Sequence, residues 1–338
     1  MRYYVNHKKS DEKIKIPKEF IEASSLSRSI FSKPESSLIS PPRAIIKNLS
    51  LSKRLVIVDD TAQQVGAFKI RGAFAGVFSE IYRNRCISKI HVASSGSFGM
   101  SVSKVATGLE VFVHMPKTTP CLKQVKIRKN GASVLANYNS YEQAKAAAIA
   151  CASKSQASTF IDGVSWDVFA GNATLIQDVI NQGTVPRDRC LMLIPLGIGS
   201  LLIPTALQLA QHKIFPEFIA IEPETFAKTP SYMGHSIHAP YSETIADGAA
   251  VKELPYFTIP MIVNICSGVS LISEEEITFS IQKLWTEQGI KAEGAGALAY
   301  SVISSNPSIL SDFDDIWVFV TGNNIHSDIF DSCLNYKQ

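Results

Sequence analysis

Short β-branched runs alternate with longer helical stretches along most of the chain, and this alternation constrains the fold more than any other feature. The runs that predict strands lie at 55–58, 90–93, 111–114, 133–135, 191–195, 218–222 and 316–320. The stretches that predict helices lie at 70–84, 100–107, 122–129, 140–154, 170–182, 201–211 and 274–288. Because the connections are short, the pattern favours an α/β protein with mainly parallel sheets. A loop near 159–167 divides the pattern into two sets, so we expect two domains with a ligand cleft at the carboxyl ends of the strands.

Composition narrows the class of protein. The chain has 338 residues, 46% hydrophobic and 19% charged, as expected of a globular protein with a sizeable core. Its 33 basic and 30 acidic residues are intermixed, so we expect no nucleic-acid partner. The six cysteines form no Cys-x-x-Cys pair, which argues against a zinc site or a disulfide framework and favours reduced thiols in a cytoplasmic protein.

Two segments bear on targeting and on the membrane. Residues 1–20 lack an apolar centre and predict no secretory signal. Residues 190–212 contain no charged side chain, but Pro195 and Gly197 interrupt them, so they predict a strand, a turn and a helix, not a membrane span. Residues 1–50 are polar, and we expect an irregular arm over the core.

A glycine turn, Gly197-Ile198-Gly199-Ser200-Leu201, follows an apolar strand and opens an apolar helix. Backbone N–H groups in such a turn, together with the helix N-terminus, form a cradle suited to phosphate. Purely structural turns share this pattern. A nucleotide P-loop would need Gly-Lys-Ser/Thr, and a dinucleotide fingerprint would need glycine in place of Leu202. A phosphate bound here therefore belongs to another kind of ligand.

Lys69 stands at the expected start of a helix, after the turn-like Gly66-Ala67. Taken alone it is an ordinary exposed lysine. A lysine in a partly apolar cleft can instead have a lowered pKa and serve as a neutral amine for Schiff-base chemistry. Polar turns also follow the strands at 93–99, where small residues suit a carboxylate or simply cap a helix, and at 320–324.

The histidines carry less information. No metal-ligand spacing is evident among them, so we expect core or solvated roles for His91, His114, His212, His235, His238 and His326. No histidine or aspartate adjoins a Gly-x-Ser-x-Gly element, so a serine hydrolase is disfavoured.

The order of these turns resembles the threonine dehydratase and serine racemase branch of the fold-type II (tryptophan synthase β-like) pyridoxal-5′-phosphate (PLP) enzymes. The resemblance extends from about 40 to 324 and rests on motifs at 68–73, 94–96, 115–132, 170–172, 197–201, 222–223, 244–248, 293–296 and 321–324. It implies a two-domain α/β fold, each domain a mainly parallel twisted sheet flanked by helices, with the active site in the interdomain cleft. It also implies a large PLP-binding domain of 1–80 and 166–338, and a small domain of 81–165.

The resemblance implies a role in cofactor binding for several positions. Lys69 would bind PLP as a Schiff base, and Phe68 would pack near the ring. The glycine turn 197–201 would hold the phosphate. Thr321 would hydrogen-bond the pyridine nitrogen, and Glu293 would lie near the ring.

Other positions would contact the substrate. Ser94, Ser95 and Gly96 would receive the substrate carboxylate, and Ser95 also stands where racemases place an acid/base. Ser97 stands where relatives usually have an Asn that bonds the 3′-oxygen of PLP, and Ser97 would reach that oxygen only from a shifted backbone or through water. Phe98 replaces the usual His.

Further departures lie near the lysine and in the phosphate turn. Ala67 replaces a usual Ser, and Ile198 and Ser200 replace typical glycines. We therefore expect a specialised substrate.

The proposed role of Thr321 points to a reaction. A hydroxyl is a far weaker acid than a pyridinium, so the ring nitrogen should stay unprotonated. A poorer electron sink disfavours a long-lived carbanion and favours loss of a β-substituent. The resemblance thus implies a lyase that dehydrates and deaminates a small hydroxy-amino acid, such as serine or threonine, to a 2-oxo acid and ammonia.

Three alternatives stay open: a β-replacement synthase that uses an aminoacrylate intermediate, an amino-acid racemase, and a catalytically silent PLP- or amino-acid-binding protein. The resemblance also implies a homodimer. Metal-activated relatives carry an Asp six residues after the Glu of Glu222-Pro223, where this chain has Lys228. Since lysine supplies positive charge itself, we expect no divalent-metal requirement and no metal ligand.

Overall fold

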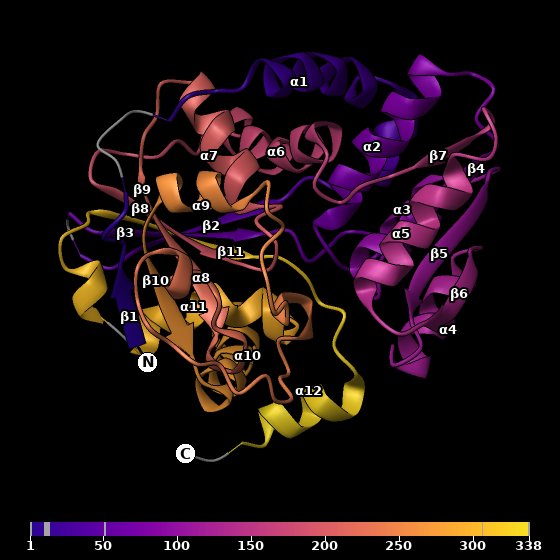
Figure 1. Ribbon diagram of the computed structural model, residues 1–338. Coiled ribbons are helices and arrows are strands. Elements are labelled where there is room, and N and C mark those ends of the chain that lie inside the picture. The colour runs from indigo at the N-terminus through magenta and orange to yellow at the C-terminus, as the bar shows by residue number, and fades with distance from the viewer. Residues whose placement is uncertain (1, 10–13, 51, 306, 337–338) are drawn as a thin grey trace. The chain divides into compact units, whose positions relative to one another are not determined.

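The computed structural model describes residues 2–9, 14–50, 52–305 and 307–336, and in it strands and helices alternate (Figure 1). The strands are β1 (Arg2–Val5), β2 (Arg43–Asn48), β3 (Arg54–Asp59), β4 (Lys89–Ala93), β5 (Glu110–Pro116), β6 (Ser133–Tyr138), β7 (Ser158–Phe160), β8 (Cys190–Pro195), β9 (Glu217–Pro223), β10 (Cys266–Ile272) and β11 (Asp315–Val320). The α-helices are α1 (Lys18–Phe31), α2 (Lys69–Arg83), α3 (Ser97–Val105), α4 (Cys121–Lys129), α5 (Tyr141–Ala152), α6 (Trp166–Asn181), α7 (Leu202–Gln211), α8 (Thr229–Tyr232), α9 (Ile259–Ile265), α10 (Glu274–Gln288), α11 (Gly294–Ser305) and α12 (Ser327–Leu334). Every predicted strand and helix is therefore present.

The chain forms two compact units. The first comprises Met1–Ile16, Ser40–Ala67 and Ala173–Gln338, and the second comprises Pro17–Ile39 and Phe68–Asn172. The domain boundaries expected from the sequence, 1–80 with 166–338 against 81–165, stay a prediction. By their contacts, 17–39, 68–80 and 166–172 group with the second unit.

A seven-stranded sheet in the order β1-β10-β9-β8-β11-β3-β2 forms the centre of the first unit. The strands from β10 to β3 are parallel, and the edge strands β1 and β2 are antiparallel to their neighbours. Every residue of β3 and β11 is buried. Burial of both faces is expected of parallel strands covered by helices on each side, and Figure 1 shows α7 and α9 on one side with α10 and α11 on the other.

The second unit has a four-stranded parallel sheet in the order β6-β5-β4-β7. Helix α5 packs on β4, β5 and β7. Helix α1 packs on α2, where the Phe31 and Phe74 rings meet edge-on with their centroids 5.0 Å apart.

The expectation that residues 1–50 form an irregular arm is wrong. They contain β1, α1 and β2, and α1 buries Phe20, Ala23, Ser27 and Ile30 at helical spacing. Two serines on this buried face, Ser24 and Ser27, interrupt the apolar pattern in the sequence, so the pattern does not predict the helix.

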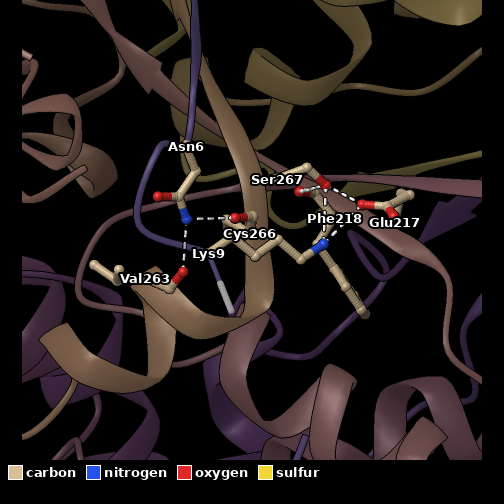
Figure 2. A network of polar contacts seen from close by, with 7 residues as sticks. All are labelled: Asn6, Lys9, Glu217, Phe218, Val263, Cys266 and Ser267. Atoms are coloured by element: carbon tan, nitrogen blue, oxygen red, sulfur yellow. Dashed lines mark hydrogen bonds and ion pairs between the residues drawn. The ribbon is translucent and has the colours of Figure 1, made fainter. Parts of the chain in front are cut away.

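The N-terminal strand is fixed to the sheet edge by main-chain pairing and by the polar contacts in Figure 2. Asn6 Nδ2 donates to the carbonyl oxygens of Val263 and Cys266, at 2.6 and 2.7 Å. Lys9 Nζ lies 2.8 Å from Glu217 Oε2, to which the Ser267 hydroxyl also donates. This segment is therefore part of the first unit.

Residues 190–212 fold as predicted into strand β8, the glycine turn and helix α7. Among the described residues, no helix has both the length and the hydropathy required to cross a membrane.

A buried ion pair joins the amino ends of two neighbouring strands. Arg54 at the start of β3 donates through Nε and Nη2 to the two carboxylate oxygens of Asp315 at the start of β11, both at 2.6 Å. Trp317 Nε1 and the Arg187 amide also donate to Asp315, each at 2.8 Å. Burial by itself would raise the pKa of Asp315, but these hydrogen bonds, with that of Arg54 the largest, hold the pKa below its ordinary value.

We predict that Arg54→Met destabilises the protein by about 3–5 kcal/mol, because it leaves the Asp315 carboxylate buried without a counter-charge. The free energy of unfolding in urea measures this. Arg189→Met is the matched control: Arg189 forms a mostly exposed pair with Asp314, so its loss should cost less than about 1 kcal/mol. Equal losses in the two variants would contradict the prediction.

Candidate active site

The glycine turn 197–201 and Thr321 each follow one of two neighbouring strands of the first unit. The turn follows β8 and Thr321 follows β11, and these strands pair in parallel. In α/β proteins the carboxyl ends of adjacent parallel strands are the usual place for a ligand. Thr321 is buried, with 6% of its surface exposed.

The glycine turn forms a close-walled cradle. Gly199 has φ +88°, a conformation that favours glycine, and a Cβ there would lie 3.0 Å from the side chains of Ile203 and Ile262. A Cβ on Gly197 would lie 3.3 Å from the carbonyl oxygen of Gly248. Helix α7 begins directly after the turn, so its first amides are directed toward this end. A phosphate group fits these features.

Glu293 lies beside the same turns. Its amide donates to the carbonyl oxygen of Gly322 at 2.9 Å. A Cβ on Gly322 would collide with the Glu293 carboxylate, and one on Gly248 would lie 3.9 Å from it. The first unit thus brings together Glu293, the turn after β11 and, through Gly248, the glycine turn.

Lys228 forms a buried pair with Glu222. Its Nζ lies 2.7 Å from Glu222 Oε1, and the two side chains are 2% and 0% exposed. The Thr229 hydroxyl and the amides of Lys228 and Thr229 also donate to Glu222. Lys228 Nζ donates further to the carbonyl oxygen of Leu196 at 3.3 Å. The lysine therefore links the end of β9 to the residue just before the glycine turn.

The turn after β11 holds the segment that precedes Lys69. Asn323 Nδ2 donates to the Thr61 carbonyl oxygen at 2.9 Å, and Asn324 Nδ2 donates to that of Val65 at 2.6 Å. Ala67 pairs with Gly322 in an isolated β-bridge. We call these contacts between 61–67 and 322–324 the clasp. Lys69 follows two residues after it in the sequence.

Lys69 is the first residue of α2 in the second unit, and its Nζ lies 5.6 Å from the centroid of the Phe68 ring. Phe68 is buried. The start of this helix is fixed by α6: Asn172 Oδ1 accepts the Gly72 amide at 2.9 Å. A Cβ on Gly72 would lie only 2.6 Å from that oxygen. The first turn of α2 and helix α6 therefore approach each other closely at Gly72 and Asn172.

The loop after β4 is organised by Ser94. Its Oγ accepts the amides of Gly96 and Gly99, at 3.2 and 3.0 Å. Ser97 is the first residue of α3, and Ser95 is partly exposed. The Phe98 ring packs over Gly163. The second unit thus holds Lys69, Phe68 and 94–97, while Thr321, Glu293 and 197–201 belong to the first.

A buried cluster that the sequence did not predict lies in the second unit. His91 Nδ1 is 3.1 Å from His114 Nε2, and His114 Nδ1 is 2.9 Å from the Tyr138 hydroxyl. Cys151 completes a group whose candidate ligand atoms lie within 4.8 Å of one another. The residues are far apart in the sequence, so only the pairing of β4 with β5 could have revealed them.

Burial lowers the pKa of both imidazoles below its ordinary value. Burial is the main cause that lowers the pKa of His91, with Lys89 adding to it. Burial, followed by the neighbouring His91, lowers the pKa of His114 to about 4. Both shifts favour the neutral form of the imidazole.

The comparison with protein families now identifies the class of protein. The family described as "Pyridoxal-phosphate dependent enzyme" matches residues 43–322, and the chain belongs to this family. PLP is the cofactor of the family, as the resemblance implied.

Particular relatives agree with this assignment. The L-threonine ammonia-lyase of Geobacter sulfurreducens is 31% identical over 72% of this chain and 61% of its own length. The chloroplastic threonine dehydratase of Arabidopsis thaliana is 28% identical over 77% of this chain, but only 45% of its own length is matched. The chain thus spans less than two thirds of these relatives. The structure of threonine deaminase isoform 2 from Solanum lycopersicum has the same fold, with a TM-score of 0.79, 20% identity and coverage of 98% of this chain and 91% of that one. The two-domain α/β fold predicted from the sequence is confirmed.

We predict that Lys228→Met destabilises the protein by about 3–5 kcal/mol, because the Glu222 carboxylate keeps its hydrogen bonds but loses its counter-charge in a buried position. Adding Glu222→Gln to this variant should restore more than half of the loss, since the amide removes the buried charge. Unfolding in urea of the two single variants and the double variant measures the coupling. Additive losses would show that the pair does not interact.

Proposed function

We propose that this chain is a PLP-dependent ammonia-lyase that converts a small 3-hydroxy amino acid, such as serine or threonine, into a 2-oxo acid and ammonia. The observation that carries the proposal is the position of Lys69. The chain belongs to the PLP family, and Lys69 begins a helix two residues after the segment 61–67. This segment is held by the clasp to the turn that carries Thr321. The relative named L-threonine ammonia-lyase supports this choice of reaction.

Lys69 would hold PLP through its amine and later act as the base. When bound, PLP withdraws electrons from the substrate Cα and acidifies its C–H bond. With the substrate in place, the freed Lys69 amine would remove the Cα proton. The Lys69 ammonium would return this proton to the β-hydroxyl, so that the C–O bond breaks and water leaves. The released enamine would tautomerise to an imine, whose C=N bond water hydrolyses to give a 2-oxo acid and ammonia.

The remaining residues would orient the cofactor and the substrate. The turn 197–201 suits the phosphate, because glycine conformation and the start of α7 meet there. Thr321 would place its hydroxyl at the ring nitrogen and keep that nitrogen unprotonated, and Glu293 would lie near the ring. Ser94, Ser95 and Gly96 would bind the substrate carboxylate at the start of α3. Ser97 would lie toward the cofactor oxygen.

The expected homodimer follows from the resemblance alone, whereas the expected cytoplasmic location follows from the cysteine pattern. We propose a homodimer in the cytoplasm, without a nucleic-acid or membrane partner. A second reaction, racemisation through Ser95, is supported by the serine racemase of Rattus norvegicus, which is 24% identical over 83% of this chain. β-Replacement and silent binding are outcomes of the tests below.

We predict that the purified protein has the visible absorption band of a PLP–lysine linkage, and that Lys69→Ala abolishes the band and the activity together. Addition of serine, threonine, hydroxyaspartate, O-acetylserine and O-phosphoserine, one at a time, should release a 2-oxo acid from at least one of them. The control is Lys129→Ala, at the exposed end of α4, which should leave both readouts unchanged.

The spectrum also separates the alternatives. A changed band without 2-oxo acid would favour β-replacement, inversion at Cα would favour a racemase, and a band that only shifts would indicate silent binding. No band after addition of PLP would refute the proposal.

We predict that magnesium and calcium leave the activity and the melting temperature of the wild-type protein unchanged, because the Lys228 ammonium already lies at the Glu222 carboxylate. Lys228→Asp should make the protein sensitive to magnesium. The two buried carboxylates of that variant suit a hard divalent cation, so magnesium should raise its melting temperature. Magnesium-dependent activity in the wild type would contradict the prediction.

A further inference from the structure

The cluster of His91, His114 and Cys151 lies between the sheet and a helix of the second unit, and none of its members is among the residues proposed to act in catalysis. His91 is on β4 and His114 is on β5. Ala93 pairs with His114 and His91 pairs with Phe112, so both histidine side chains point to the same face of the sheet. Helix α5, which carries Cys151, packs on these two strands.

The spacing of the ligand atoms suits one tetrahedral metal ion. Zinc–nitrogen bonds of about 2.0–2.1 Å place two ligand nitrogens about 3.3–3.4 Å apart, and a sulfur ligand about 3.6 Å from each. The two histidine nitrogens that face each other are 3.1 Å apart. All three ligand atoms lie within 4.8 Å of one another, so shifts of about an ångström at Cys151 bring them to bonding geometry.

The surroundings prepare the histidines as ligands. Tyr138 at the end of β6 bonds the other nitrogen of His114 at 2.9 Å, which fixes the ring orientation as outer-shell partners of metal-bound histidines do. The ring of His91 stacks on Phe112, with centroids 5.0 Å apart and planes 13° apart. His114 is fully buried, whereas Cys151 is partly exposed and leaves a route for an ion.

We propose that His91, His114 and Cys151 bind one zinc ion, with water as the fourth ligand. Two imidazoles and a thiolate are a donor set that zinc prefers and that magnesium and calcium do not. Binding releases the Cys151 thiol proton to solvent. The proton of the histidine–histidine hydrogen bond moves, through solvent, to the other nitrogen of its own ring, and three protein–zinc bonds form. The proposal differs from the expectation of no metal ligand, because the register of β4 against β5, which brings the two histidines together, could not be derived from the sequence.

Zinc at this place joins α5 to the strands that support the 94–96 loop. His91 lies three residues before Ser94, and the carbonyl oxygen of His114 accepts the Ser94 amide at 3.1 Å. An ion here would therefore stiffen the base of this loop. Zinc binding itself does not depend on the proposed ammonia-lyase activity.

Cobalt is the spectroscopic probe. Full-length protein with bound PLP is stripped of metal and of free cofactor, and one equivalent of Co²⁺ is added, with the zinc-loaded protein as the spectral reference. We expect tetrahedral cobalt bands and a thiolate-to-cobalt band, both removed by one equivalent of Zn²⁺. Cys151→Ser should abolish the thiolate band, and Tyr138→Phe should weaken zinc affinity about 10–100-fold. The matched control is Cys86→Ser, an exposed cysteine of the same unit, which should keep both bands.

The wild-type protein provides a second test that needs no variant. Zinc should slow alkylation of Cys151 by about tenfold or more, because the bound thiolate is no longer free to react. The exposed Cys86 and Cys121 should react at the same rate with and without zinc, which peptide mass spectrometry can follow. The proposal is overturned if wild type shows no thiolate band, if the band persists in Cys151→Ser or disappears in Cys86→Ser, or if zinc does not protect Cys151.

Discussion

The clasp between 61–67 and 322–324 is the constraint on which the arrangement of the first unit's candidate residues depends. Strand β11 lies between β8 and β3, and its carboxyl end leads directly into Thr321. The next three residues hold the chain that leads to Lys69, by one β-bridge and two asparagine side chains. Gly66 accommodates this contact at φ +65°, where a Cβ would collide with Asn323. One turn therefore fixes both the buried hydroxyl and the approach to the lysine.

Two buried ion pairs fix the opposite ends of the same sheet. Arg54 and Asp315 lie at the amino ends of β3 and β11, while Lys228 and Glu222 lie by the carboxyl end of β9. A buried charge without its partner is costly, so neither pair tolerates displacement of its strand or turn. At the carboxyl end this restricts Leu196, and with it the first residue of the glycine turn. Lys228 thus provides a fixed positive charge beside the Glu222 carboxylate.

Much of this could be predicted because the signals are local. Buried parallel strands such as β8 and β11 are continuous apolar runs, and the glycine turn between β8 and α7 has a local conformational cause. Strand β10 escaped prediction because serines and a glycine interrupt it. Gly268 is required there, since a Cβ would lie 2.5 Å from the Tyr4 carbonyl oxygen of β1. The pair of His91 and His114 escaped for another reason: it exists only through the register of two strands.

The departures from the family's loop sequence can be understood from the contacts of that loop. Ser94 shapes the loop by accepting two backbone amides. Phe98 packs over Gly163, so the usual imidazole is replaced by an apolar contact within the second unit. If the loop binds the substrate carboxylate, that group is still recognised by the backbone and by Ser94 and Ser95. The changes at Ser97 and Phe98 then affect contacts with PLP or with the substrate side chain, and not the contacts with the carboxylate. A substrate that differs from those of the relatives would therefore differ in its side chain.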